Sequence, residues 1–210
     1  MQNNKRKAAF FDVDGTIISI KSLVSFVQYL EINNDAEVPL PALSIFVKNL
    51  QEKLCSESQR RQLNRHYFSI YKNISHMAIT RVANKWFPDV EKSEGFYIEE
   101  SIKEIKRLKR EGHFIVLVTG SFLPLLLTLK ERLGADDIIC TTPECIDGIY
   151  TGELIGNPCI GEYKRTRVMA YAIENNIDLS KSYAFGDDDS DLYMLQTVGN
   201  GVRVASNSTY

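Results

Sequence analysis

Apolar residues follow two different spacings along the chain, and the change between them predicts a core and an insert. Residues 7–13 are apolar up to the first aspartate and predict a buried strand. From residue 21 to residue 92 apolar positions recur every three or four residues, as is typical of amphipathic helices. From residue 93 onward, helix-like and strand-like segments alternate. We therefore expect one domain from residues 1–20 and 93–210, with residues 21–92 as a helical insert.

The spacing within the insert predicts four helices. Proline is favoured in the first turn of a helix, so Pro39 and Pro41 mark the start of the second. Proline disfavours helix at the residue before it, so we expect the fourth helix to end at Pro88. The apolar positions of the four helices are Leu23, Phe26, Val27 and Leu30; Leu43, Phe46, Val47 and Leu50; Leu63, Tyr67 and Ile70; and Met77, Val82 and Trp86.

The remainder of the chain predicts a parallel, doubly wound α/β sheet of the Rossmann-like kind, because strands that alternate with helices imply right-handed crossovers. Two glycine-containing dipeptides that favour turns predict a small antiparallel hairpin appended to this sheet. The expected elements are a helix ending at Gly112, a strand over 113–119, a turn at Gly120 and Ser121 into a helix ending near Gly134, a strand over 138–141, the hairpin over 145–155, a helix over 163–175, a strand over 182–186, a short helix over 192–197 and a strand over 201–204.

Carboxylates gather where two of these strands end, which is where such sheets bind ligands. Asp12 and Asp14 share one face of an extended segment, and Gly15 allows a sharp turn after them. Crowded carboxylates repel unless a cation neutralises them, so an all-oxygen site for Mg²⁺ is expected. Two acids that follow the second of these strands, Asp188 and Asp189, could instead cap a helix N-terminus. The second group is Asp187, Asp188, Asp189 and Asp191.

Two further segments are candidates for binding an anion. Thr119, Gly120 and Ser121 end a predicted strand before a helix, where a hydroxyl and free amides could hold a phosphate. Serine and threonine are also ordinary caps, which is the alternative here. Lys164 could neutralise the acids, although three cations in four positions are also typical of a solvated helix face. These cations are Lys164, Arg165 and Arg167.

The composition excludes several classes of protein. The 210 residues contain 25 Lys plus Arg and 27 Asp plus Glu, so no overall basic field favours nucleic acid. The apolar stretches are shorter than the ~20 residues of a membrane span, and acids interrupt the apolar run near the N-terminus. We expect a cytoplasmic monomer or homodimer with reduced thiols, since no CxxC pair occurs. The cysteines are Cys55, Cys140, Cys145 and Cys159.

The order of these motifs resembles the haloacid dehalogenase superfamily of phosphatases, in particular its phosphoserine-phosphatase-like branch with a helical cap after the first strand. DVDGT at 12–16 resembles the first motif, and VTGSF at 118–122 resembles the second. Lys164 resembles the third, and GDDDSD at 186–191 the fourth. The resemblance covers nearly the whole chain and implies Mg²⁺-dependent hydrolysis of a small phosphorylated metabolite.

The resemblance also implies a role for each motif residue. Asp12 would attack phosphorus and become an aspartyl-phosphate, while Asp14 would protonate the leaving alcohol and then activate water. The implied metal site consists of Asp12, the backbone carbonyl of Asp14, Asp187 and, through the surrounding shell, Asp191. The implied phosphate contacts are Thr119, Gly120, Ser121 and Lys164.

The chain departs from the family where phosphoserine phosphatases carry a substrate-binding glutamate shortly after the nucleophile. Lys21 and Ser22 occupy that neighbourhood, so they are candidate substrate contacts and phosphoserine itself is not expected. The basic stretch of the insert could also contact the leaving group, or could form a solvated helix face with its tyrosine buried. A phosphotransferase and a non-catalytic phosphate- or metal-binding module remain alternatives. The basic stretch comprises Arg60, Arg61, Arg65, His66 and Tyr67.

Overall fold

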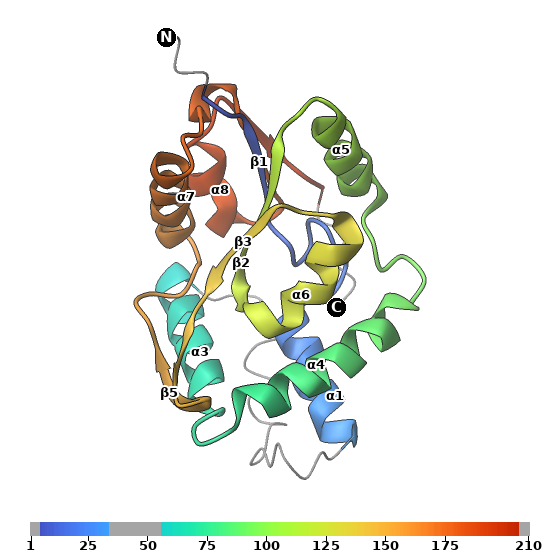
Figure 1. The fold of residues 1–210 in the computed structure, drawn as a ribbon, viewed down its shortest axis with the longest axis vertical. Coiled ribbons are helices and arrows are strands. Elements are labelled where there is room, and N and C mark those ends of the chain that lie inside the picture. The colour runs from blue at the N-terminus through green and yellow to red at the C-terminus, as the bar shows by residue number, and fades with distance from the viewer. Residues whose placement is uncertain (1–4, 34–55, 206–210) are drawn as a thin grey trace.

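The computed structural model describes residues 5–33 and 56–205, and its centre is a five-stranded sheet with order β3-β2-β1-β6-β7 (Figure 1). Every pairing within this sheet is parallel, which confirms the expected α/β architecture. The helix expected from Pro39 to Leu50, and Cys55, lie outside the described residues. The strands are β1 (Ala8–Phe11), β2 (Phe114–Phe122), β3 (Asp137–Thr141), β6 (Tyr183–Gly186) and β7 (Asn200–Arg203).

Helices cover both faces of the sheet, which explains why its inner strands are apolar throughout. Ala8 and Phe10 of β1 belong to the buried cluster that includes residues of α7 and α8. Ala9 and Phe11 belong to the opposite cluster, which includes residues of α5 and α6. The covering helices are α5 (Glu99–Arg110), α6 (Leu123–Leu133), α7 (Glu162–Glu174) and α8 (Leu192–Leu195), with short 3₁₀ turns η1 (Leu179–Lys181) and η2 (Asp189–Asp191).

The helical cap comprises α1 (Ser22–Asn33), α3 (Glu57–Ser69) and α4 (His76–Glu91), which lie together at one end of the molecule (Figure 1). Its apolar side chains join the same cluster as one face of the sheet. The ring of Phe122 at the end of β2 lies 5.2 Å from the Phe68 ring and 5.7 Å from the Tyr71 ring. The cap therefore packs on the core through a continuous aromatic cluster.

The expected end of the fourth cap helix at Pro88 is wrong. Helix α4 continues through Pro88 to Glu91, while Trp86 and Phe87 are buried beside it. Proline at this position cannot donate to the carbonyl of Asn84, but Asn84 is exposed, so water can take the missing donor's place. The burial of the two aromatic side chains stabilises the final turn.

The expected turn at Gly120 and Ser121 is also wrong. Strand β2 runs through both residues to Phe122, and α6 begins only at Leu123. The pairing with β3 shifts register between Thr119 and Phe122, where Phe122 lies opposite Thr141. This long-range pairing keeps the segment extended, so its amides belong to an irregular strand end and not to a first helical turn.

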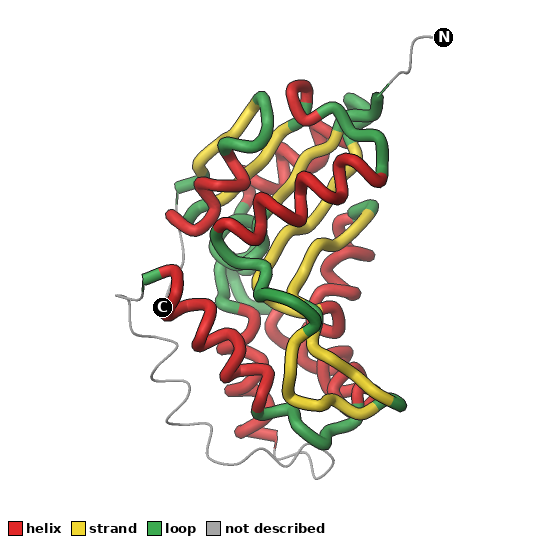
Figure 2. The backbone as a smooth tube through the Cα atoms, turned by 90° about the vertical axis from the view of Figure 1, so that its left-hand side faces the viewer, coloured by secondary structure: helices red, strands yellow, loops and turns green. Residues whose placement is uncertain are grey.

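The predicted antiparallel hairpin is present, as β4 (Pro143–Ile146) and β5 (Ile149–Leu154), but it forms a sheet of its own. Positive φ angles of 51° and 80° at Asp147 and Gly148 form its tight turn. Three backbone hydrogen bonds attach the hairpin to the segment between α3 and α4, away from the main sheet (Figure 2). They run from Tyr150 N to Ile74 O (2.9 Å), from Asn73 N to Tyr150 O (2.8 Å) and from His76 N to Gly148 O (2.8 Å).

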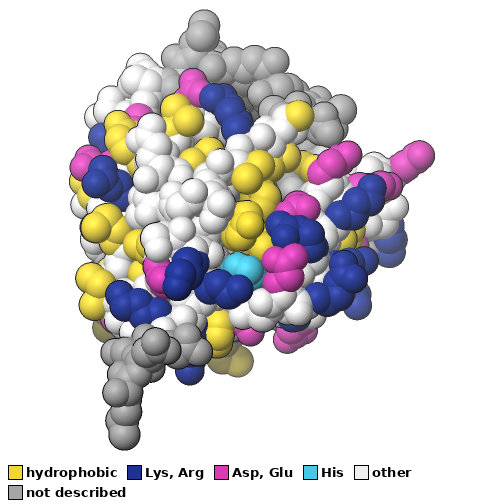
Figure 3. All heavy atoms as spheres, turned by 90° about the horizontal axis from the view of Figure 1, so that it is seen from above, with side chains coloured by type: hydrophobic (Ala, Val, Ile, Leu, Met, Phe, Trp, Pro, Cys, Tyr) yellow, Lys and Arg dark blue, Asp and Glu magenta, His cyan; other side chains and the backbone are white. Residues whose placement is uncertain are grey.

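The face opposite the cap carries basic and acidic side chains interspersed with apolar ones (Figure 3). This mixture agrees with the formal net charge of −2. None of the helices in the described ranges combines the length and apolar character that crossing a bilayer requires.

Candidate active site

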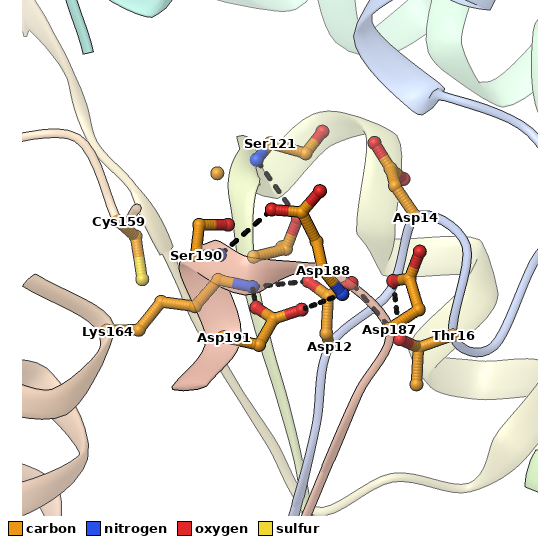
Figure 4. A network of polar contacts seen from close by, with 12 residues as sticks. Asp12, Asp14, Thr16, Ser121, Cys159, Lys164, Asp187, Asp188, Ser190 and Asp191 are labelled. Atoms are coloured by element: carbon orange, nitrogen blue, oxygen red, sulfur yellow. Dashed lines mark hydrogen bonds and ion pairs between the residues drawn. The ribbon is translucent and has the colours of Figure 1, made fainter. Parts of the chain in front are cut away.

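Three buried carboxylates from two neighbouring strand ends converge on one point (Figure 4). Asp12 follows β1 and donates its backbone N–H to the carbonyl of Phe185 in β6, at 2.9 Å. Asp187 follows β6, and Asp191 lies in η2. One oxygen from each of the three carboxylates lies within 4.8 Å of the others. The structure thus brings together the acids that the sequence placed at separate strand ends.

Thr16 joins two of these acids, although the sequence indicated only a turn at this position. Its hydroxyl lies 3.3 Å from Asp12 Oδ2 and 3.0 Å from Asp187 Oδ1. The turn needs glycine at position 15, where φ is 95° and any Cβ would collide with the Asp187 carboxylate. Sequence reasoning missed this bridging role, because only the fold shows that the turn lies against the loop after β6.

Lys164 points into the carboxylate cluster, so the interpretation of this residue as part of a solvated helix face is wrong. Its side chain is 4% exposed, and its Nζ lies 2.5 Å from Asp12 Oδ1 and 2.6 Å from Asp191 Oδ1. Burial lowers the pKa of Lys164, but the two carboxylates raise it by more, so the group stays cationic. The neighbouring Arg165 is exposed, as a solvated face requires.

The balance of charge in the cluster fits a divalent cation. Among the described residues, the cluster of Asp12, Asp187 and Asp191 contains one ammonium group, that of Lys164, which pairs with Asp12 and Asp191. Burial, and then the charge of Asp12, raises the pKa of Asp191 to about 6. An all-oxygen donor set in which acids outnumber cations suits Mg²⁺, which prefers a few carboxylates together with water.

Asp14 stands apart from the other three acids and has its own partners. Its Oδ2 accepts hydrogen bonds from the backbone N–H and the hydroxyl of Ser22, both at 2.9 Å. Its backbone carbonyl accepts a bond from Lys21 Nζ at 3.1 Å. Burial raises the pKa of Asp14 more than Lys21 and Ser22 lower it. The other carboxylate oxygen, Oδ1, is buried and finds no donor among the described residues.

Ser121, near the end of β2, lies beside the carboxylates (Figure 4), and Thr119 and Gly120 precede it in the same strand. Thr119 Oγ1 accepts a hydrogen bond from the backbone N–H of Ser121 at 3.1 Å. The carbonyl of Gly120 accepts bonds from Asn64 Nδ2 and from Thr141 Oγ1, each at 2.9 Å. The hydroxyl of Ser121 is buried and has no partner in the described part of the chain.

Helix α3 of the cap lies over this end of the core and contacts it through polar side chains. Arg60 pairs with Asp188 at 2.5 Å, and Arg65 donates to the carbonyl of Gly156 at 3.1 Å. Arg65 and His66 are exposed, as the solvated face requires, and Tyr67 is buried as expected, whereas Arg60 is half-buried against Asp188. Asn64 was not singled out from the sequence; the signal available was its position four residues after Arg60, on one helix face.

Of the two acids with an alternative role at a helix N-terminus, Asp188 is a cap, whereas Asp189 lies in the first turn of η2. Asp188 accepts a hydrogen bond from the backbone N–H of Ser190, which it caps, and Asp189 pairs with Arg203. Burial raises the pKa of Asp188, but the bonds from Arg60 and Ser190 outweigh it and lower the pKa to about 2. Within the described residues, neither acid belongs to the cluster that could hold a metal.

Comparison with known proteins identifies the family to which the chain belongs. A phosphoserine phosphatase of Mycobacterium tuberculosis is 24% identical over 201 residues, which cover 94% of this chain and 64% of that protein, so the chain spans under two thirds of its length. The fold matches a Bordetella pertussis protein of unknown function with a TM-score of 0.75, at 20% identity and over 98% and 92% of the two chains. It also matches a phosphoserine phosphatase solved as a phospho-aspartyl intermediate analogue, with a TM-score of 0.65, 21% identity and coverage of 96% and 87%. A model of haloacid dehalogenase-like hydrolases matches residues 9–196, and the chain belongs to that family.

Proposed function

We propose that the protein is a Mg²⁺-dependent phosphatase that hydrolyses a small phosphomonoester through an aspartyl-phosphate on Asp12. The observation that carries the proposal is the buried contact of Asp12 with Lys164, beside the carboxylates of Asp187 and Asp191. The similarity to phosphoserine phosphatases supports the same reaction. Phosphoryl transfer mainly needs positioning and neutralisation of charge, and this cluster offers both.

In the first step an oxygen of Asp12 attacks phosphorus, and the bond from phosphorus to the ester oxygen breaks. Asp14 gives its proton to that oxygen as the alcohol leaves. In the second step Asp14 takes a proton from water, the water oxygen attacks phosphorus, and the bond from phosphorus to the Asp12 oxygen breaks, which releases inorganic phosphate and restores the Asp12 carboxylate. Burial of Asp14 raises its pKa, and its Oδ1, which has no donor among the described residues, is available for this proton.

The remaining groups hold the phosphoryl group and its charge. Lys164 neutralises Asp12 and the phosphate, and Thr119 with the segment at Gly120 and Ser121 would bind phosphoryl oxygens. Asp12, Asp187 and the carbonyl of Asp14 would hold Mg²⁺, with Asp191 beside them. When bound, the ion supplies charge neutralisation at the transferring phosphoryl group.

Lys21 and Ser22 orient Asp14 and lie where a leaving group would enter. Their presence in place of an acidic residue leaves no carboxylate there for the ammonium of phosphoserine. A small phosphomonoester other than phosphoserine is therefore the substrate class that we propose.

Release of inorganic phosphate from p-nitrophenyl phosphate and from a panel of phosphorylated metabolites tests the proposal. We expect turnover with Mg²⁺, none with EDTA, and a loss of at least 10³-fold in Asp12→Asn, because the amide is not a nucleophile. Asp189→Asn is the matched control, since the Asp189 side chain is 81% exposed and pairs only with Arg203 among described residues. The absence of turnover on every substrate, or activity that survives Asp12→Asn, would refute the function.

A further inference from the structure

We propose that Asn64 on cap helix α3 selects the substrate by accepting a hydrogen bond from a neutral hydroxyl group on the leaving alcohol. This inference deepens the proposed phosphatase function and rests on it. Its basis is the buried side-chain amide of Asn64, in which the nitrogen has a hydrogen-bond partner and the oxygen has none among the described residues. Nδ2 donates to the carbonyl of Gly120 at 2.9 Å, while Oδ1 is buried without a donor in the described part of the chain.

The orientation of this amide follows from its partner. A backbone carbonyl can only accept, so the amide nitrogen must face Gly120 and the oxygen must point elsewhere. Asn64 is 5% exposed, so bulk water does not replace the missing donor. A buried acceptor without a partner is unfavourable, and a donor on a bound ligand would remove that cost.

The position of the unsatisfied atoms indicates a ligand. Four buried side-chain atoms lack a partner among the described residues, and three of them belong to Asn64, Ser121 and Asp14. Asn64 contacts the residue directly before Ser121, at the strand end where we place the phosphate. Asp14 is the acid that would protonate the leaving group. We infer that the three unsatisfied groups face one phosphate ester that carries its own polar atoms.

The charges around Asn64 favour a neutral donor over an ammonium group. Asn64 has no charge, and the residue one turn earlier on the same face of α3 is Arg60. Arg60 pairs with Asp188, so this carboxylate of the core already has a cation as its partner. The ligand class is therefore phosphate esters of alcohols that carry a further neutral hydroxyl group, such as glycerol phosphate.

Three substrates that differ in one group test the inference: 2-hydroxyethyl phosphate, ethyl phosphate and 2-aminoethyl phosphate. For the unmodified protein we expect kcat/KM on the hydroxyl compound to exceed that on each of the other two by at least about tenfold. In Asn64→Leu, a variant with the same branching at Cγ but no polar atoms, the ratio of hydroxyl to ethyl compound should fall to near one. The fold should tolerate this variant, because Thr141 still donates to the carbonyl of Gly120.

Arg65→Gln is the matched control, because Arg65 makes another contact from α3 to a core carbonyl. A purely structural role of α3 would lower kcat/KM equally on both substrates, so this control should leave the ratio unchanged. A ratio near one in the unmodified protein, or a ratio that Asn64→Leu does not alter, would overturn the inference while leaving the phosphatase function intact. A preference for the amino compound would overturn the choice of a neutral donor. Failure to hydrolyse any ester, p-nitrophenyl phosphate included, would remove the proposed function and this inference with it.

Discussion

The acids of the site differ because each carboxylate has different partners. Burial raises the pKa of Asp12, but Lys164 opposes this shift by pairing with the carboxylate, and Thr16 donates to its other oxygen. Asp14 is half-buried beside Ser22 and keeps one oxygen without a donor among the described residues. Two chemically identical side chains, two residues apart, thereby acquire the separate tasks of nucleophile and proton carrier.

Replacing Ser22 by alanine tests the role of Asp14. The hydroxyl of Ser22 stabilises the ionised carboxylate, so its loss should raise the pKa of Asp14 further. Because the second step needs ionised Asp14, the acidic limb of the kcat profile should move to higher pH, and kcat should fall about tenfold. Ser25→Ala is the control, since Ser25 lies on the same helix but accepts a bond from Trp86. An acidic limb that stays in place would show that Ser22 does not act on this proton.

At the scale of elements, much of the fold could be predicted because the apolar pattern reflects burial directly. The run at Phe10 and Phe11 marks a strand covered on both faces, and the turn at Asp147 marks the hairpin. Spacing alone could not show which face of the helix meets the site, so only the family resemblance distinguished Lys164 from its neighbours Arg165 and Arg167. Local signals also failed at Gly120, where pairing with a distant strand outweighs the tendency of glycine to turn.

Pro88 removes one backbone hydrogen bond from α4, and substitution can measure the effect of this loss on the free energy of unfolding. Pro88→Ala would restore a hydrogen bond to the carbonyl of Asn84 and should raise the free energy of unfolding by about 1 kcal/mol. The gain should stay below the full ~3 kcal/mol cost of proline in a helix, since proline also restricts the unfolded chain. Thermal or urea denaturation gives the value, with Lys85→Ala on the exposed face as a control expected within about 0.5 kcal/mol of the unmodified protein. A lower stability of Pro88→Ala would mean that the ring's own packing matters more than the missing bond.

At the scale of the whole molecule, the cap and the core share one apolar cluster. The cluster runs from Phe11 in the sheet through Phe122 to Phe68 and Trp86 in the cap. Trp86 also donates to Ser25 at 3.1 Å, which joins α4 to α1. Although the sequence separates the insert from the core by its helical texture, the packing makes the stability of each depend on the other.

Trp86 is the only tryptophan in the chain and is fully buried in the cap, so its fluorescence reports on the cap alone. We expect its transition in urea to coincide with that of far-UV circular dichroism, which reports on all helices and strands. The physical reason is that loss of the cap would expose the sheet's aromatic cluster. A fluorescence transition at lower urea concentration than the dichroism transition would show that the cap unfolds first. The same comparison in Phe122→Ala, where the shared cluster is weakened, should separate the two transitions.

The hairpin attaches to the cap through backbone hydrogen bonds, in addition to the chain crossings at the ends of the cap and the contacts of its side chains with the core. A body joined at two points can rotate about the line between them, whereas a further joint restricts that rotation. If the cap moves to admit substrate, either the hairpin travels with it or the three backbone hydrogen bonds at Asn73, His76 and Tyr150 break together. In the second case, admission of substrate requires a small β-sheet more than 50 residues further along the chain to loosen at the same time.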